Sequence, residues 1–411
     1  MILLLLLFVV LFISCTHDVK TIITLEESPI VAERIPFKGD SLVVADFDKV
    51  MQAGTINFPM SKFCEWYELV KLDNSRKDIM IPHTSYFVAS DNYLMAQDGG
   101  NIILLFDKFG KYLMQIGEKE GPGGYNGFYN SGYIDEINQQ IIIPITNGIK
   151  IYSLINGQVE SFFQPFGGMN LANRQCIPWG YHTYLCSRSP EELNHDVLEL
   201  IGIDGIHISG FPSKYFHAKS FQPLPYLPTF WAYNDFICLW KNEENEVSFF
   251  LQPVAYPAQD TIYHYHVDNS VLKPDFTVNY PDKENVKQHF NYETPSYYYI
   301  IYMEPVEVSK MFSVGWGNFP GERVIIDKKT LKGCKVRFCL DNHGWLDISD
   351  GRSWILNGYF TLNLTPDKLM SMIEKQLKQK NITEENRKTL RDLYDSIGED
   401  DNNYVVFGKV K

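Results

Sequence analysis

The amino-acid sequence predicts an all-β protein that folds as a six-bladed β-propeller, with a C-terminal helical hairpin inserted in the last blade. Three observations support this fold class. Tyr and Phe are abundant, with 25 and 27 residues in a chain of 411, and such side chains favour pleated strand surfaces. A strand-and-turn motif recurs six times along the chain, and one interval between its copies contains two helices.

The first element is an N-terminal apolar run. Residues 2–13 are all apolar, and Ser14 and Cys15 follow. These twelve residues are too few for a membrane-spanning helix, which needs about 20, but they fit the hydrophobic region of a secretory signal. Ser14 before Cys15 resembles the lipobox of bacterial lipoproteins, which implies that Cys15 is acylated. No Lys or Arg precedes the run, and the alternative is a buried N-terminal strand or helix.

The recurring motif is an apolar strand that ends in a tight turn. In the clearest copy, residues 103–106 lead into Asp107 and Gly110, and a second strand starts at Tyr112. Asp and Gly are residues that hairpin turns require. The intervals between copies are 46, 51, 64, 59 and 81 residues, counted between Asp107, Ser153, Asp204, Asp268, Asp327 and Gly408. Each of the first four intervals has room for the four strands of one propeller blade.

The last interval is longer because it contains a helical hairpin. Thr365 and Pro366 form a helix start, a capping hydroxyl followed by Pro at the first helical position. A second helix starts at Thr383 and stops at Gly398, and apolar residues follow at helical spacing in both segments. Residues 365–397 are thus a 33-residue insertion, and without it the interval is 48 residues.

The sixth blade lacks an outer strand at the end of the chain. We expect residues 41–46, near the N-terminus, to supply it, because ring closure removes exposed strand edges. The predicted division of the chain is therefore a lipoprotein signal peptide at 1–14, a lipidated tether at 15–40 and a propeller at 41–411, with the helical insertion at 365–397.

Charge and cysteine content limit the function classes. The formal net charge of −13 argues against nucleic acid, whose phosphates need clustered Lys and Arg. Besides Cys15 there are six cysteines, which we expect to be mostly buried free thiols. An exported protein can also form disulfides, and Cys176 and Cys186 flank a predicted hairpin turn.

Residues 106–125 carry a strand, a turn, an Ile-Gly pair, a Gly-Pro-Gly and an aromatic residue in that order. This stretch resembles one typical of the six-bladed β-propeller lipoproteins of Bacteroidetes. Residues 260–263, 272–274 and 402–411 also match, so the resemblance runs from about residue 60 to the end. It implies the propeller fold and a cell-envelope location, lipid-anchored in the outer membrane and facing the periplasm or the surface. It carries over no catalytic residue.

Sequence motifs do not identify a cofactor or metal site. The glycine-rich residues 121–124 lack the Lys-Ser/Thr and helix of a phosphate loop. His264 and His266 lie two apart on a predicted strand and project from one face, so they could share a metal. No third ligand is near them in sequence, and polar strand residues are the default, so we predict no metal and no cofactor. Folding could still gather some of the histidines scattered over other blades, which are His182, His195, His207, His217 and His343. The oxygen-rich turns at 341–344 and 399–403 lack the spacing of a calcium loop.

The function predicted from these observations is binding. The chain contains none of the Gly-x-Ser-x-Gly, His-Glu-x-x-His or Cys-x-x-Cys motifs, so we predict no catalytic residue. We expect a lipid-anchored binding or scaffold protein for a glycan, peptide or protein partner, with an unknown ligand site. Tryptophans and the run Tyr297, Tyr298 and Tyr299 could stack on such a ligand, although most Trp side chains should be buried.

The alternative is a propeller enzyme, a lyase or hydrolase with its site at the central channel. Carboxylates clustered at the channel mouth would favour this alternative. A channel lined only by apolar and amide side chains would argue against it.

Overall fold

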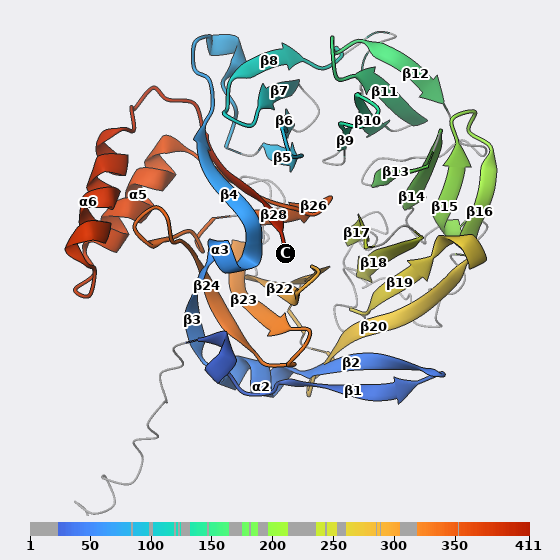
Figure 1. The fold of residues 1–411 in the computed structure, drawn as a ribbon, viewed down its shortest axis with the longest axis horizontal. Helices are drawn as coiled ribbons and strands as arrows, with labels where there is room; N and C mark the ends of the chain where they lie inside the picture. The colour runs from blue at the N-terminus through green and yellow to red at the C-terminus, as the bar shows by residue number, and fades with distance from the viewer. Residues whose placement is uncertain are drawn as a thin grey trace, which may run out of the picture.

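A computed structural model describes residues 24–83, 85–97, 102–118, 121, 124, 132–145, 148–163, 175–180, 182–187, 196–212, 236–242, 245–252, 260–284, 286–287, 289–304, 319–351 and 353–411. Within these residues the strands form six sheets, which are arranged as blades around one axis (Figure 1). The six-bladed β-propeller predicted from the repeat is confirmed. The signal peptide and Cys15 lie outside the described residues.

The first three blades each contain four consecutive strands, which follow one another from the axis outward. Blade 1 is β5 (Tyr86–Ala89), β6 (Tyr93–Gln97), β7 (Ile103–Asp107) and β8 (Tyr112–Gln115). Blade 2 is β9 (Tyr133–Asp135), β10 (Gln140–Ile145), β11 (Gly148–Ser153) and β12 (Val159–Phe163). Blade 3 is β13 (Cys176–Gly180), β14 (Thr183–Ser187), β15 (Asp196–Gly202) and β16 (His207–Pro212).

The last three blades also take strands from the N-terminal part of the chain. Blade 4 is β17 (Phe236–Lys241), β18 (Glu246–Gln252), β19 (Ile262–His266) and β20 (Val271–Asn279), extended by β2 (Asp40–Asp46) and β1 (Ala32–Phe37). Blade 5 is β21 (His289–Glu293), β22 (Tyr297–Glu304), β23 (Phe319–Asp327), β24 (Gly333–Leu340) and β25 (Leu346–Asp347), with β3 (Thr55–Pro59) beside β24. Blade 6 is β26 (Ser353–Leu356), β27 (Tyr359–Leu364), β28 (Tyr404–Val410) and β4 (Cys64–Lys71).

The predicted repeat marks the third strand of each blade. Asp107, Ser153 and Asp327 end β7, β11 and β23, while Asp204 and Asp268 each lie two residues past the end of β15 and β19. The motif was recognisable because the third strand is buried on both faces and then turns sharply to the exposed fourth strand. In blade 2, for example, all six residues of β11 are buried, whereas the first four residues of β12 alternate between half-buried and exposed positions.

The prediction that residues 41–46 close the ring was wrong. In the structure β2 pairs in parallel with β20 and extends blade 4, with Val43 opposite Phe276. The strand that closes blade 6 is β4, which is antiparallel to β28 from Tyr404 opposite Lys71 to Val410 opposite Cys64. Both β2 and β4 combine buried apolar residues with exposed polar ones, so either could cover an outer edge, and their order around the ring decides between them.

The N-terminal segment runs along the outside of three blades. It contributes β2 to blade 4, β3 to blade 5 and β4 to blade 6, and the blue segments in Figure 1 follow this path. The short helices α2 (Phe47–Gln52) and α3 (Met60–Phe63) connect these strands. Short 3₁₀ helices occur at Leu25–Glu27, Lys77–Ile79 and Val267–Asn269. Residues 24–40 of the predicted tether are therefore packed on the propeller.

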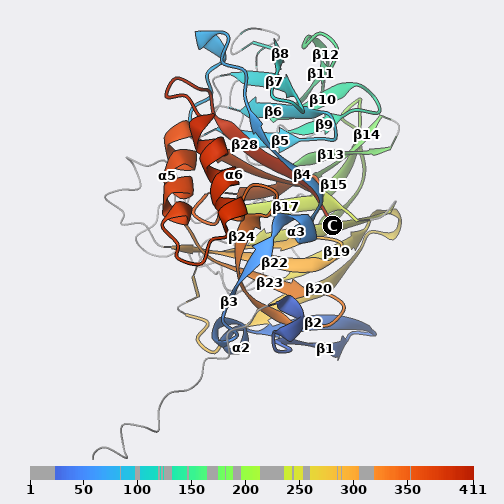
Figure 2. The same cartoon turned by 60° about the vertical axis from the view of Figure 1, so that its left-hand side comes forward.

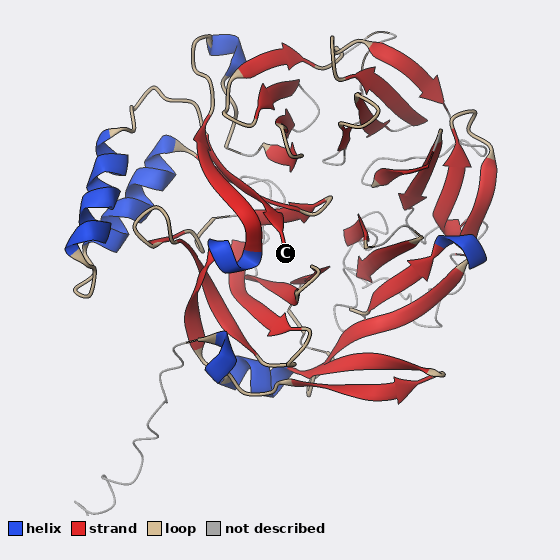
Figure 3. Cartoon of the chain, in the orientation of Figure 1, coloured by secondary structure: helices blue, strands red, loops and turns tan. Residues whose placement is uncertain are grey.

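The predicted helical hairpin is confirmed as α5 (Pro366–Leu377) and α6 (Glu384–Asp395), between β27 and β28. Thr365 accepts a hydrogen bond from the backbone N–H of Lys368, and Thr383 accepts one from Asn386, so both predicted N-caps are formed. The two helices stand at the outer edge of the ring (Figures 2 and 3). Their buried residues Leu369, Ile373 and Leu390 join the core of blades 5 and 6.

Aromatic side chains fill the space between the later blades. Tyr298 stacks on Phe276 of blade 4, with ring centroids 4.2 Å apart, and Phe63 packs against Phe338 and Tyr299. Such pairs are worth about 0.5–1.5 kcal/mol beyond their burial.

Among the cysteines, Cys64, Cys176, Cys334 and Cys339 are buried free thiols, as predicted, and Cys186 is also buried. No helix within the described ranges is long and apolar enough to cross a membrane.

Candidate functional site

A cavity of about 640 Å³ lies at one mouth of the central channel. Its walls come from the inner strands of five blades, with Tyr133 on β9, Ile177 on β13, Trp240 on β17, Glu293 on β21 and Ile355 on β26. Because each blade contributes its innermost strand, the cavity lies on the propeller axis. It lies at the face where the first and second strands of each blade are joined, since Asn242, Thr294 and Asn357 of those turns also line it.

The cavity wall carries charges of both signs and aromatic rings. The cavity is lined by three lysines and three glutamates, Lys241, Lys328, Lys409, Glu65, Glu246 and Glu293, and by the aromatic residues Trp240, Tyr133 and Tyr359. A smaller cavity of about 370 Å³ adjoins it, sharing Tyr133, Asn357 and Tyr359 and adding the acidic residues Asp91, Asp135 and Glu136. The channel mouth is therefore polar and charged, with the clustered carboxylates that favour an enzyme.

His264 and His266 project from one face of β19, as the sequence predicts. In the register of β18 and β19, Ser248 lies opposite His264 and Glu246 lies opposite His266. The two imidazoles are joined through one carboxylate, because Glu246 Oε1 is 3.1 Å from His264 Nδ1 and Glu246 Oε2 is 3.0 Å from His266 Nε2.

A β-bulge brings Asp275 to the same cluster. Ile262 pairs with Phe276 but Tyr263 pairs with Pro274, so Asp275 is the extra residue of β20. Bulges of this kind redirect a side chain. The Asp275 Oδ2 atom lies 3.6 Å from His264 Nε2 and accepts a hydrogen bond of 2.7 Å from Tyr298 Oη.

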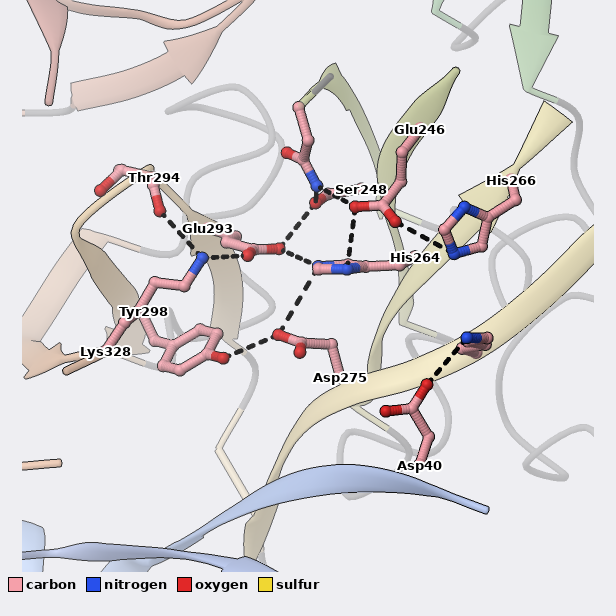
Figure 4. Close-up of polar contacts among 12 residues, drawn as sticks. Asp40, Glu246, Ser248, His264, His266, Asp275, Glu293, Thr294, Tyr298 and Lys328 are labelled. Atoms are coloured by element: carbon pink, nitrogen blue, oxygen red, sulfur yellow. Dashed lines mark hydrogen bonds and ion pairs between the residues drawn. The ribbon is translucent and has the colours of Figure 1, made fainter. Parts of the chain in front are cut away.

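Glu293 reaches the cluster from blade 5, at the end of its inner strand. Its side chain is 2% exposed, and its Oε2 atom lies 2.8 Å from His264 Nε2 and accepts a 2.6 Å hydrogen bond from Ser248 Oγ. Lys328 pairs with the other oxygen of Glu293. Figure 4 shows His264 at the centre of these contacts, between Glu246, Glu293 and Asp275. The cluster thus joins blades 4 and 5 at the cavity wall.

The environment separates the pKa values of the cluster. Burial alone would raise the pKa of Glu293, but the hydrogen bond from His264 and the charge of Lys328 lower it to about 2. For Asp275, burial and the charge of Glu293 raise the pKa above its ordinary value. Burial would lower the pKa of His264, but the hydrogen bond to Glu293 and the nearby carboxylates raise it. Opposed shifts on neighbouring carboxylates are a feature of acid–base sites.

The other polar candidates from the sequence have structural partners. The turn residue Asp341 accepts hydrogen bonds from Tyr67 Oη and the Ser61 backbone N–H, and Asp401 pairs with Lys71, so both oxygen-rich turns fasten the closing strand. His207 pairs with Asp196 on blade 3 at 2.9 Å. His195, His217 and the central residues Pro122 and Gly123 of the glycine-rich loop lie outside the described residues.

The predicted aromatic platform does not form as a unit. Tyr298 and Tyr299 are buried in the core of blade 5. Of the tryptophans, Trp240 lines the cavity, Trp179 and Trp354 are half-buried, and Trp345 is exposed. Trp231 and Trp316 lie outside the described residues. The expectation that most Trp side chains are buried therefore does not hold for these four.

Sequence reasoning missed four members of the cluster. Glu246, Asp275, Glu293 and Lys328 carry no motif, and none lies within eight residues of His264. The repeat offered one signal. Consecutive strands of a blade are neighbours, so a strand just before the one that carries His264 could have pointed to Glu246.

Comparison with known proteins supports the fold alone. No protein-family model matches the chain, and no curated protein matches it. The structure is similar to the crystal structure of a candidate exported protein of Bacteroides fragilis, at 14% identity and a TM-score of 0.56, covering 87% of this chain and all of that one. The six sheets around one axis place the chain in the structural class of six-bladed propellers.

Two further solved structures are less similar. A dihydro-heme d1 dehydrogenase in complex with DHE has 14% identity and a TM-score of 0.33 over 67% of this chain and 51% of that one. The extracellular domain of a one-component system of B. thetaiotaomicron has 13% identity and a TM-score of 0.35 over 66% of this chain and 29% of that one. These similarities are too low to support an inference.

Proposed function

We propose that the protein is a binding protein that holds a glycan or peptide fragment in the channel-mouth cavity. The observation that carries this proposal is the convergence of inner strands from five blades on one cavity of about 640 Å³ with acidic, basic and aromatic walls. Ligand sites typically have volumes of about 300–1,000 Å³ and a few converging polar groups.

The wall chemistry supports a polar ligand. Lys241 and Lys409 offer donors to carboxylate or hydroxyl oxygens, and Glu65 accepts from amino or hydroxyl groups. Trp240 and Tyr133 present aromatic rings beside these charges, and aromatic rings stack on the apolar faces of sugars and peptides.

A pair of Trp variants tests the proposal. Fragments of glycans and peptides would be screened by thermal shift, and binders measured by calorimetry. We expect Trp240→Ala to weaken binding at least tenfold, about 1.4 kcal/mol, and Trp345→Ala, which is exposed outside the cavity, to leave it unchanged. Equal binding to both variants, or no binder in a broad library, would refute the proposal.

A second candidate function is a hydrolase or lyase in the same cavity. The observation that favours it is His264 between two carboxylates whose pKa values are shifted in opposite directions. Product formation from pooled polysaccharides and peptides would be followed by chromatography. Activity that survives His264→Gln would argue against this candidate.

We also propose that Cys15 anchors the protein to the cell envelope through a lipid. The lipobox resemblance supports this, and so does the similarity to a Bacteroides fragilis structure described as a candidate exported protein. Residues 16–23 separate Cys15 from Thr24, a span of at most about 30 Å. Replacing Cys15 by Ala should release the protein from the membrane fraction, and retention there would contradict the proposal.

The point of attachment favours one orientation. Residues 25–31 lie against the turn between β23 and β24, where Val31 N–H donates to Leu331 O at 2.9 Å and Lys332 bonds Glu26 O. The same turn carries Lys328 to the cavity. In this arrangement the blade 5 rim of the cavity face is turned toward the membrane.

A further inference from the structure

We infer that His264, Asp275 and Glu293 form a binding site for one divalent transition-metal ion, with Zn²⁺ as the ion that the ligands suit best. The three side chains each offer one ligand atom, and these atoms lie within 4.8 Å of one another. They come from blades 4 and 5, so the site forms only when these two blades pack against each other.

The spacing of the ligand atoms matches a metal centre. Zn²⁺ binds His nitrogen and carboxylate oxygen at about 2.0–2.2 Å, so two ligands at tetrahedral or octahedral angles are about 3.0–3.5 Å apart. His264 Nε2 lies 2.8 Å from Glu293 Oε2 and 3.6 Å from Asp275 Oδ2. Both distances from His264 Nε2 are thus within a few tenths of an ångström of this range, and all three ligand atoms lie within 4.8 Å of one another.

Each ligand has a partner that would orient it. His264 Nδ1 faces Glu246 Oε1 at 3.1 Å, which is the carboxylate–histidine–metal arrangement that holds the other ring nitrogen toward an ion. Asp275 accepts from Tyr298 Oη, and Glu293 is held by Lys328 through its second oxygen. Ser248 Oγ donates a hydrogen bond to Glu293 Oε2. This bond uses one lone pair of the oxygen and leaves the second for the metal.

The negative charge around His264 also favours the binding of a cation. Glu246, Asp275 and Glu293 carry three negative charges, and Lys328 is the ammonium group paired with them. A divalent ion beside His264 Nε2 would replace the proton that this nitrogen otherwise shares with the carboxylates, and it would compensate their negative charge.

The mixed ligand set selects the type of ion. Ca²⁺ and Mg²⁺ prefer oxygen ligands alone, whereas an imidazole nitrogen with carboxylates suits Zn²⁺ and its neighbours in the first transition series. Three protein ligands leave a coordination position open. His264 and Glu293 line the cavity, so this position would face the space proposed for the ligand.

Calorimetric titration of the chelator-treated protein with ZnCl₂ tests the inference. No organic ligand is present in the titration, so its result is independent of the proposed binding function. We expect one equivalent to bind to the wild-type protein, and His264→Gln and Asp275→Asn to weaken binding at least tenfold. His207→Gln is the matched control because it removes another His–carboxylate pair, with Asp196 on blade 3, and it should bind as the wild type does.

Absence of stoichiometric binding to the wild type, or its persistence in His264→Gln, would overturn the inference. If a variant does not fold, X-ray absorption of the wild-type protein loaded with one equivalent of Zn²⁺ decides the question. We expect one imidazole among nitrogen and oxygen ligands. Two imidazole ligands would instead place the ion between His264 and His266, and sulfur ligands would place it at a cysteine site. Either result would overturn the inference.

Discussion

Lys71 on the closing strand β4 forms an ion pair with Asp401, which lies just before β28, the strand that β4 covers. The Asp401 side chain is 7% exposed, and it also accepts hydrogen bonds of 2.8 Å from the Gly398 N–H and Tyr404 Oη and of 3.2 Å from Asn74 Nδ2. The Asp401 carboxylate thus connects β4, the strand that closes the ring, to the segment just before β28, the last strand of the chain.

We expect Asp401→Ala to lower the free energy of unfolding by about 2–4 kcal/mol, because it removes a charged acceptor from several donors at once. The matched control is Asp392→Ala, which removes the exposed pair of Asp392 with Lys388 on α6 and should cost less than about 0.5 kcal/mol. Urea unfolding measures both. Equal losses in the two variants would contradict the role assigned to Asp401.

The ionised Asp401 side chain should also make the stability of the β4–β28 closure depend on pH. Burial alone would raise the pKa of Asp401, but hydrogen bonds from Lys71, Gly398 and Tyr404 lower it below its ordinary value. A lowered pKa in the folded state stabilises the protein above the unfolded value of about 3.9, and this stabilisation is lost as pH falls through the folded pKa.

The stability difference between the wild type and Asp401→Asn should therefore be constant above about pH 5 and shrink at lower pH. Guanidinium unfolding at a series of pH values measures this difference. A difference that grows on acidification would show that Asp401 is not ionised in the folded protein.

Truncation tests which strand closes the ring. A chain that starts at residue 47 lacks β1 and β2 but keeps β3 and β4. We expect it to lose stability, because the buried Val43 and Ala45 no longer cover blade 4, yet to unfold cooperatively as a propeller. A chain that starts at residue 73 also lacks β3 and β4, and we expect it to lose cooperative unfolding and protease resistance, since β28 then has an unpaired edge.

Circular dichroism during thermal unfolding, together with limited proteolysis, distinguishes the two truncations. If the chain starting at residue 47 were already open and protease-sensitive, β2 and not β4 would be the strand on which closure depends.

The sequence predicted local features better than long-range ones. The third strands of the blades were found because each is apolar and ends near an Asp or Gly turn, and the helices were found because Thr365 and Thr383 cap them. The identity of the closing strand depends on how β2, β3 and β4 follow one another around the ring, and no local pattern encodes that order. The 46–81-residue intervals between repeats place the blades but not their added edge strands.

The candidate site was only half predictable for the same reason. His264 and His266 share a face because of strand geometry, which sequence spacing shows directly. Asp275 joins them through a bulge whose position depends on the pairing of β19 with β20. Glu293 arrives from the next blade, 29 residues further along the chain, and only the packing of blade 5 against blade 4 brings it to His264.

Two glycines in the left-handed region separate backbone strain from close packing at the helical hairpin. Gly344 has φ +69°, and a Cβ atom there would lie 2.8 Å from Asn386 O and from Leu390 Cγ of α6. Gly358 has φ +83° in the β26–β27 turn, and a Cβ atom there would meet nothing within 4 Å. Replacement of either by Ala incurs the left-handed backbone penalty of about 1–2 kcal/mol.

Only Gly344→Ala also displaces α6. We expect it to destabilise the protein by about 1–3 kcal/mol more than Gly358→Ala, the range for overpacking a filled site. Urea unfolding gives the difference, and hydrogen exchange should show increased opening of α6 in Gly344→Ala alone. Equal effects of the two substitutions would mean that the hairpin can move away from the β24–β25 turn without cost, and its packing on blade 5 would then contribute little to the stability of the propeller.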